Sequence, residues 1–190
     1  VDLSAVLRKK TALFLSVSDS DRSQDALVNL FYTQALQYLM AAAGRQPDSR
    51  LPIPVRFILD DFSTNTVIPD FDSIISVIRS REIYVSLIIQ SLSQLEGLYG
   101  SAKAQTIING CDHCLYLGGT DIQTARYFAE KFNFQVSTVL NLPLDSAFLF
   151  ARGSEPRKVQ KYELNRDNAY RALTQARDGA EANAEKECAI

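Results

Sequence analysis

The sequence is poor in the residues that define several classes of protein. Its 190 residues include three cysteines, one histidine and no tryptophan. An odd and sparse set of cysteines argues against a disulfide framework and indicates a reducing compartment. No apolar run reaches the ~20 residues of a membrane-spanning helix, and the first residues have neither the basic region nor the apolar run of a signal peptide. We therefore expect no membrane span in this chain.

The chain also lacks a strong excess of charge. Lys and Arg number 20 against 22 Asp and Glu, which gives a formal net charge of -2. A chain so nearly neutral cannot bind nucleic acid or an acidic membrane through bulk positive charge, so such a contact would need a local patch. With 46% hydrophobic and 22% charged residues, the composition is that of a folded globular protein, and the length fits one domain of ordinary size.

Apolar runs of strand length alternate with segments of helical periodicity along most of the chain. The expected strands are residues 11–18, 55–59, 83–89 and 114–117, and the expected helices are residues 21–44, 71–79, 94–108 and 120–132. Farther along, weaker strand patterns cover residues 136–142, 147–151 and 159–164. The alanine-rich tail from Asp167 to Lys186 has a helical composition with few large apolar residues to bury. This order predicts an α/β fold, with a mostly parallel sheet flanked by helices.

Polar residues follow the expected strands at their carboxyl ends, where open parallel sheets usually have their catalytic and ligand-binding residues. Asp60 and Asp61 come directly after one strand, Gln90 follows the next, and Gly118 and Gly119 follow a third. Two carboxylates after an apolar strand match the Walker B arrangement, in which one acid supports a magnesium ion and the next orients or deprotonates the attacking water. A solvated turn or a helix cap is the alternative interpretation of the Asp-Asp pair.

An ordered series of segments resembles one protein family. The series runs through Val55-Arg-Phe-Ile-Leu-Asp-Asp-Phe62, Ile68-Pro-Asp-Phe71, Ile78-Arg-Ser-Arg-Glu-Ile83 and Leu87-Ile-Ile-Gln-Ser-Leu-Ser-Gln-Leu95. It extends back to residues 11–15 and 31–34 and forward through residues 109–112, 115–119 and 148–153. Together these segments resemble the C-terminal half of the motor domain of type IV secretion coupling proteins, the TraG/TraD family of conjugation ATPases. The resemblance covers most of residues 9–164.

The resemblance implies a RecA-like P-loop ATPase that works as a hexameric ring at the cytoplasmic, inner face of a bacterial membrane. Such a motor passes DNA or protein substrates to a secretion channel, which makes DNA or a relaxase–DNA complex, secretion-channel proteins, ATP and Mg the expected partners and cofactors. Residues 1–165 would form the C-terminal part of the ATPase domain, and residues 166–190 a helical or flexible tail. The first residue is Val, which suggests a piece of a longer protein.

The resemblance also implies roles for individual residues. Asp60 would support the magnesium ion, and Asp61 stands where the family usually has a catalytic glutamate that is one methylene longer. Gln90 matches the sensor glutamine, whose amide can hydrogen-bond a γ-phosphate or its attacking water. Arg79 falls at the position of an arginine finger that acts on the adjacent subunit's nucleotide, with Arg81 as a close competitor. The alternatives are a favourable helix-end cation for the arginines and a helix cap for Gln90.

No phosphate loop of the pattern G-x-x-x-x-G-K-[ST] occurs in the chain. The backbone nest and the lysine that hold the β- and γ-phosphates are therefore missing, and in the family they lie upstream. We expect this polypeptide alone to bind ATP poorly and not to hydrolyse it. Isothermal titration that gives micromolar ATP affinity for the chain would contradict this expectation.

Other motifs point to structural roles. Cys111 and Cys114 form a C-x-x-C pair around His113. A structural zinc site needs four ligands, and the remaining cysteine lies in the tail. We therefore expect structural thiols and no zinc. The basic groups near Arg8 and Arg157 could contact DNA phosphates or simply be solvated. Two further functions stay open: a non-catalytic protein-interaction module, and a fragment of an FtsK- or HerA-type DNA translocase.

Overall fold

A parallel pair of strands forms the centre of the first half of the molecule. The computed structural model describes residues 3–17, 22–62 and 67–176. Strand β1 (Val55–Leu59) pairs in parallel with β2 (Ile83–Leu87), in a register that sets Val55 opposite Ile83 and Leu59 opposite Leu87. The crossover between them is α3 (Phe71–Ile78) followed by the short helix η2 (Arg79–Arg81). A helix is the usual connection between parallel neighbours, because the chain must return to the starting edge of the sheet.

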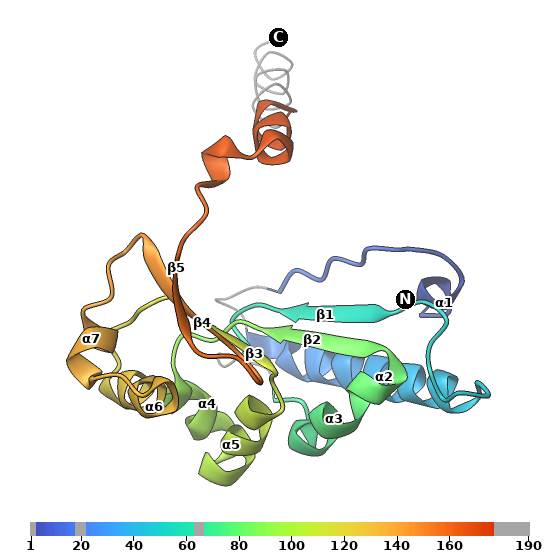
Figure 1. The fold of residues 1–190 in the computed structure, drawn as a ribbon. Coiled ribbons are helices and arrows are strands. Elements are labelled where there is room, and N and C mark those ends of the chain that lie inside the picture. The colour runs from blue at the N-terminus through green and yellow to red at the C-terminus, as the bar shows by residue number, and fades with distance from the viewer. Residues whose placement is uncertain (1–2, 18–21, 63–66, 177–190) are drawn as a thin grey trace.

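The side chains of β1 alternate between the two faces of the strand pair. Leu59 is buried, whereas Arg56, Ile58 and the following Asp60 are exposed. Because successive residues of a strand point to opposite faces, β1 directs its apolar side chains to the helices and leaves Asp60 on the open face. Besides α3, the helices α2 (Asp25–Gly44), α4 (Leu92–Tyr99) and α5 (Ser101–Asn109) contribute buried side chains to the core beside these strands, and the short helices α1 (Ala5–Arg8) and η1 (Arg22–Gln24) precede α2 in the chain. Helices α2 and α3 lie on the same side of the strand pair (Figure 1).

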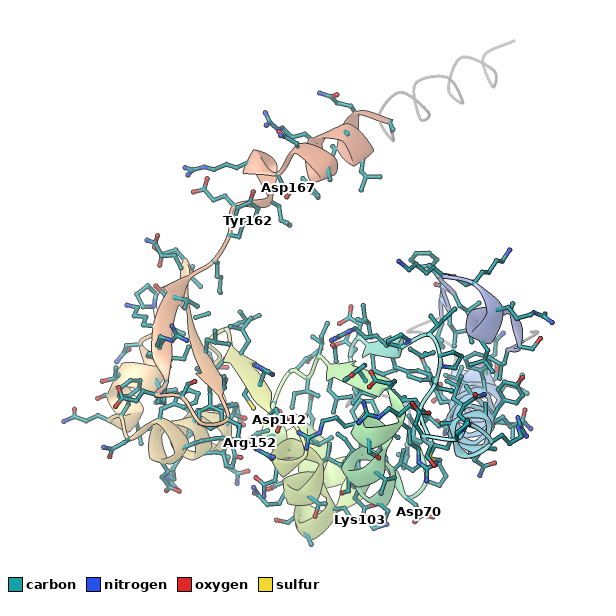
Figure 2. All side chains as sticks on the ribbon, turned by 45° about the vertical axis from the view of Figure 1, so that its right-hand side comes forward. Asp70, Lys103, Asp112, Arg152, Tyr162 and Asp167 are labelled. Carbon is teal, nitrogen blue, oxygen red and sulfur yellow. The ribbon has the colours of Figure 1, made fainter. Side chains whose placement is uncertain are left out.

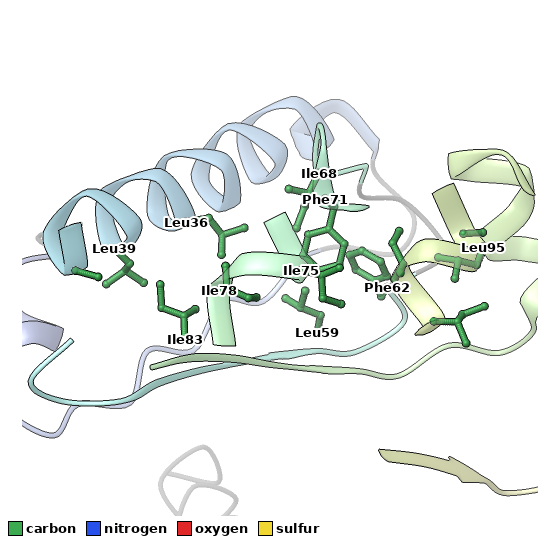
Figure 3. Close-up of a cluster of buried hydrophobic side chains, with 14 of the residues drawn as sticks. Leu36, Leu39, Leu59, Phe62, Ile68, Phe71, Ile75, Ile78, Ile83 and Leu95 are labelled. Atoms are coloured by element: carbon green, nitrogen blue, oxygen red, sulfur yellow. The ribbon is translucent and has the colours of Figure 1, made fainter. Parts of the chain in front are cut away.

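The main core lies between these helices and the strand pair. Phe71 of α3 is fully buried, and its ring packs against that of Phe62 at an interplanar angle of 48°, with 5.0 Å between ring centroids. Figure 3 shows the side chains of this cluster converging from α2, α3, α4, the strands and the loop before α3, among them Leu36, Leu39, Leu59, Ile68, Ile75, Ile78, Ile83 and Leu95. The burial of this apolar surface is the main force that fixes where β1 and β2 end, and so fixes the positions of the polar residues that follow them.

An antiparallel sheet forms the second half. Its strands are β3 (His113–Tyr116), β4 (Ser146–Ala151) and β5 (Arg157–Gln160), in the order β3-β4-β5. Helices α6 (Ile122–Phe132) and α7 (Val136–Leu140) pack on it around an aromatic cluster in which Phe132 contacts Phe148 at 5.8 Å between centroids. The short helix η3 (Leu164–Arg166) follows, and residues 161–176 lead away from the rest of the molecule (Figure 1).

The predicted α/β class is confirmed, and the structure contains a parallel strand pair. The strands expected at residues 55–59, 83–89 and 147–151 and the helices expected at residues 71–79 and 120–132 are also confirmed, with bounds that differ by a few residues at most. The single helix expected over residues 94–108 is two helices, because Gly100 adopts φ +77 between them. The strand expected at residues 159–164 begins at Arg157 and ends at Gln160. Residues 168–176 are helical, as expected, and the remainder of the predicted tail lies outside the described residues.

Two strand predictions were wrong. Residues 11–17 are irregular and pair with no strand among the described residues, and the side chain of Phe14 is 92% exposed. An apolar run becomes a strand only where a neighbouring strand can take its backbone hydrogen bonds. Residues 136–142 contain helix α7 instead of a strand, because Val139 is fully buried against the aromatic cluster and this packing overrides the β-propensity of Val and Thr. Residue 18, the last of this expected strand, and residue 21, the first of the helix expected over residues 21–44, lie outside the described residues.

No helix among the described residues combines the length and the apolar character needed to cross a membrane.

Candidate functional site

The chain turns sharply where β1 ends, and this turn presents the two predicted acids. The parallel ladder continues past the strands, because the Ile88 amide donates to the Leu59 carbonyl at 2.9 Å and the Phe62 amide donates to the Ile88 carbonyl at 3.0 Å. Between these bonds Asp61 takes the left-handed conformation, with φ 46. Asp and Asn are among the few residues that tolerate this conformation without a large steric cost. The Asp60 carboxylate accepts a hydrogen bond from the Asp61 amide at 3.1 Å.

Gln90 lies against this turn. Its Nε2 donates to Oδ1 of Asp61 at 3.1 Å, and its Oε1 accepts from Nε2 of Gln94 at 3.4 Å. The next residue, Ser91, caps helix α4 by accepting a hydrogen bond from the Gln94 amide at 3.2 Å. The structure therefore brings Asp60, Asp61 and Gln90 together at the carboxyl ends of adjacent parallel strands, and all three side chains are exposed.

This arrangement suits a metal–phosphate ligand. Carboxylate oxygens are the ligands that Mg²⁺ prefers, and protein sites for Mg²⁺ usually supply one or two carboxylates while phosphates and water complete the shell. No group of three His, Cys, Asp or Glu residues that could hold a metal by itself occurs in the part of the chain that the structure describes. The Asp60–Asp61 pair offers the one or two carboxylates that such a Mg²⁺ site needs.

Arg79 lies at the opposite end of β2 from Gln90. The five residues of β2 separate the two ends by about 16 Å, at roughly 3.3 Å per residue. The structure therefore does not bring Arg79 to the other predicted site residues. Its competitor Arg81 is half-buried, and its guanidinium lies 3.4 Å from the Met40 carbonyl oxygen of α2. Arg79, whose side chain is 67% exposed, is thus the more accessible of the two.

Two residues that sequence reasoning did not single out join Arg79. Its guanidinium forms an ion pair with Oδ2 of Asp112, and Nε of Arg152 lies 3.0 Å from Oδ1 of the same carboxylate. Figure 2 shows Asp112 and Arg152 meeting where the two halves of the chain join. They flank a hollow of about 380 Å³, which is also lined by Ser76, Thr106 and Asn109. Asp112 stands between the paired cysteines and Arg152 directly follows β4, so no short motif connects them in the sequence.

The cysteine pair is half-buried and carries free thiols. Burial raises the pKa of Cys111 to about 11, with a smaller effect of the same sign from Cys114. Burial also raises the pKa of Cys114, although Lys131 opposes the shift. Both groups are therefore protonated at neutral pH, which suits structural thiols. The expectation that this motif holds no zinc stays a prediction.

The turn at Gly118 and Gly119 leads into helix α6, whose N-cap residue is Asp121. Gly118 has φ +94, and Asp121 accepts hydrogen bonds from the backbone amide and the hydroxyl of Thr124 at the start of α6. The hydroxyl of Thr124 lowers the pKa of Asp121, with further bonds from the Thr124 amide and from Ser93. Because a carboxylate already occupies this helix start, the turn is a structural element instead of an anion site.

Comparison with protein families matches residues 54–136 to a family described as "TraM recognition site of TraD and TraG". The matched segment begins just before β1 and ends in the first turn of α7. It therefore contains Asp60, Asp61, Arg79, Gln90 and Asp112.

Curated relatives include two proteins named VirD4. The protein of Agrobacterium fabrum (strain C58 / ATCC 33970) is 27% identical over 124 residues, which is 65% of this chain and 18% of the relative. The protein of Rhizobium rhizogenes is 27% identical over 132 residues, or 67% of this chain and 19% of the relative. The chain thus spans about a fifth of the length of these relatives.

Solved structures of the bacterial conjugative coupling protein TrwB share the fold. The unbound form is 18% identical, with a TM-score of 0.63 over 74% of this chain and 37% of that chain. The complex of TrwB with ADP and Mg²⁺ is 19% identical, with a TM-score of 0.59 over 77% of this chain and 40% of that chain.

Proposed function

Because this chain belongs to the TraG/TraD family of type IV coupling proteins and corresponds to their C-terminal part, we propose that it is part of an ATPase motor. In this proposal the motor recruits a DNA or protein substrate and drives it into a secretion channel. The chain contributes the acids and the amide of one nucleotide site, and the phosphate-holding elements lie elsewhere in the complete protein.

One observation carries the proposal: Asp60, Asp61 and Gln90 converge at the carboxyl ends of two paired parallel strands. Asp60 is the Walker B acid that holds the Mg²⁺ ion, which supplies positive charge to the phosphates when bound. Asp61 orients or deprotonates the attacking water. Gln90 holds the Asp61 carboxylate through its amide and offers hydrogen bonds to the γ-phosphate or the water. TrwB has been solved with ADP and Mg²⁺ and with the ATP analogue ADPNP, which supports the same cofactors here.

Arg79 acts in trans in this proposal. Arg79 precedes β2 whereas the acids lie beyond its other end, and the strand between them is about 16 Å long, so Arg79 is far from the nucleotide of its own subunit and exposed enough to approach that of a neighbour. A ring of identical subunits, which we propose is a hexamer, provides such a neighbour at every interface. Within the ring the phosphate-bearing site of one subunit is completed by the arginine of the next.

The matched family description supports a partner surface on the same segment. It names TraM recognition for TraD and TraG, and we propose that residues 54–136 likewise contact a DNA-processing partner such as a relaxase–DNA complex. Contact with secretion-channel proteins and a position at the cytoplasmic face of the membrane belong to the same proposal. A pure interaction module without catalysis is the second candidate, because the family description concerns recognition alone.

The test is the substitution Asp60→Asn in the complete protein, with ATP hydrolysis and conjugative transfer as readouts. The amide keeps the shape of the side chain but loses the charge that holds Mg²⁺, so both activities should be lost. Asp48→Asn is the control, because Asp48 is an exposed acid whose carboxylate accepts only a local bond from the Arg50 amide at 3.1 Å among the contacts described. If Asp60→Asn transfers substrate at the unmodified rate, the chain is an interaction module and the motor proposal is wrong.

A further inference from the structure

We propose that the hollow beside Arg79 receives the phosphate groups of a nucleotide bound by an adjacent copy of the protein, with Arg152 as a second phosphate-contacting arginine and Asp112 as the residue that positions both guanidinium groups. This inference rests on the proposed ATPase function and adds two residues to it.

The carboxylate of Asp112 joins two arginines that are far apart in the sequence. Its Oδ2 contacts Arg79 at the end of α3, and its Oδ1 lies 3.0 Å from Nε of Arg152, which directly follows β4. Arg152 is also held by its Nη2, which donates to the Asn109 carbonyl at 3.3 Å, and by its backbone amide, which donates to the Asp112 carbonyl at 2.8 Å. Asp112 therefore holds the guanidinium of Arg79 next to that of Arg152, which further hydrogen bonds keep in place.

The hollow has the chemistry of a phosphate receptor. Two guanidinium groups face one carboxylate, which leaves a net positive charge, and each guanidinium has five N–H donors, more than one carboxylate can use. The polar residues Ser76, Thr106 and Asn109 line the same space of about 380 Å³. Bidentate guanidinium contacts recognise phosphate oxygens well, and hydroxyl and amide groups complete such sites.

The phosphate must come from outside the subunit. The acids and Gln90 that would hold the subunit's own nucleotide lie beyond the other end of β2, a strand that is about 16 Å long. A triphosphate held there cannot also enter the hollow beside Arg79. An adjacent copy, whose nucleotide is presented at its own strand ends, supplies the same phosphate chemistry at a subunit interface.

The exposure of the two arginines indicates that the cluster contributes to the reaction more than to the stability of the fold. The side chains of Arg79 and Arg152 are 67% and 63% exposed, whereas that of Asp112 is 27% exposed, and ion pairs to arginines this exposed contribute little to folding. Variants of this cluster should therefore keep the melting temperature of the protein while they change its reaction rate.

The first experiment compares ATP hydrolysis by Arg152→Ala, Arg152→Lys and Asp112→Asn variants of the complete protein. We expect kcat to fall at least about 10-fold for Arg152→Ala and Asp112→Asn, whereas KM for ATP stays within about 2-fold, because an arginine of this kind acts mainly by stabilising the charge of the transition state. Arg152→Lys should rescue little, because an ammonium group cannot replace the forked guanidinium contacts. Arg50→Ala is the matched control, since Arg50 is an exposed arginine paired with Glu82 at 3.2 Å outside the hollow.

The second experiment mixes Arg152→Ala subunits with Asp60→Asn subunits. Some interfaces of the mixed ring then combine the intact acids of one subunit with the intact Arg152 of its neighbour, so the activity should exceed the mean of the two separate variants. Activity no greater than that mean would overturn the trans placement. An Arg152→Ala variant that hydrolyses ATP at the unmodified rate but binds DNA more weakly would overturn the proposal in favour of a nucleic-acid contact. Full activity of Asp60→Asn alone would instead refute the ATPase function itself.

Discussion

The amide of Gln90 lies 3.1 Å from the carboxylate of Asp61, across the ends of two parallel strands whose first residues, Val55 and Ile83, are 28 positions apart in the sequence. The bond links the end of β2 to the turn after β1. A substitution at either residue therefore removes a contact that orients the other, and both side chains face a ligand placed at this edge of the sheet.

Gln90 provides the first prediction. Substitution Gln90→Ala in the complete protein removes the donor to Asp61, so the water-orienting carboxylate loses its fixed position and kcat for ATP should fall by about 100-fold. Steady-state kinetics and nucleotide binding, measured together, separate this effect from a loss of affinity. Gln105→Ala is the control, because Gln105 is an exposed amide on α5 that bonds only Asn109 at 3.2 Å among the contacts described. Equal rates for the two variants would contradict the role of Gln90.

The left-handed backbone at Asp61 provides the second prediction. Asp tolerates φ 46 because its short side chain can bond the local backbone, whereas Glu cannot do so as readily. Substitution Asp61→Glu should therefore lower the free energy of unfolding of the chain by about 0.5 to 1 kcal/mol, while Asp61→Gly should not lower it. Urea denaturation measures both values. A Glu variant as stable as the unmodified chain would show that the turn does not select Asp.

The main core provides the third prediction through two adjacent residues of α3. Ile78 is 2% exposed and Val77 is 46% exposed. Because Ile78→Ala removes buried methyl groups and leaves a cavity, we expect it to lower the free energy of unfolding by about 2 to 5 kcal/mol. Val77→Ala, the matched control, should change it by about 0.5 kcal/mol or less. Similar losses for both variants would mean that α3 is not packed as described.

Cys111 provides the fourth prediction, on the effect of pH. Burial raises its pKa from 9.0 to about 11, so the folded chain keeps a proton that the unfolded chain loses. The contribution of this group to stability is complete below pH 9 and is lost as the pH rises from 9 to 11. In a chain with Cys114 and Cys188 replaced by Ser, alkylation of Cys111 should reach half its maximal rate near pH 11 instead of pH 9. Half-maximal alkylation near pH 9 would show that the thiol is exposed.

The parts of the fold that follow from local pattern could be predicted from sequence. Strand β1 has apolar residues bounded by a proline and two acids, and α6 has helical periodicity with Asp121 as its cap, so each signal lies within a dozen residues. The convergence of Asp60 and Gln90 followed from one further rule, that parallel strands bring their carboxyl ends to one edge.

The remaining features depend on contacts between distant segments. Residues 11–17 are as apolar as a strand but have no partner strand among the described residues, and Val136–Leu140 is held as a helix by aromatic side chains from α6 and β4. The Asp112–Arg152 pair joins positions 40 residues apart by number, and only the pairing of β3 with β4 brings them together. No local pattern carries that information.

The most direct test of the account is a structure of the complete protein with Mg²⁺ and a non-hydrolysable ATP analogue. The account predicts that the Asp60 carboxylate lies in the coordination shell of the metal, directly or through a water, and that the Gln90 amide lies within hydrogen-bond distance of the γ-phosphate or the adjacent water of the same nucleotide. A nucleotide bound elsewhere, with Asp60 and Gln90 both out of its reach, would contradict the assignment of this strand edge as half of the nucleotide site.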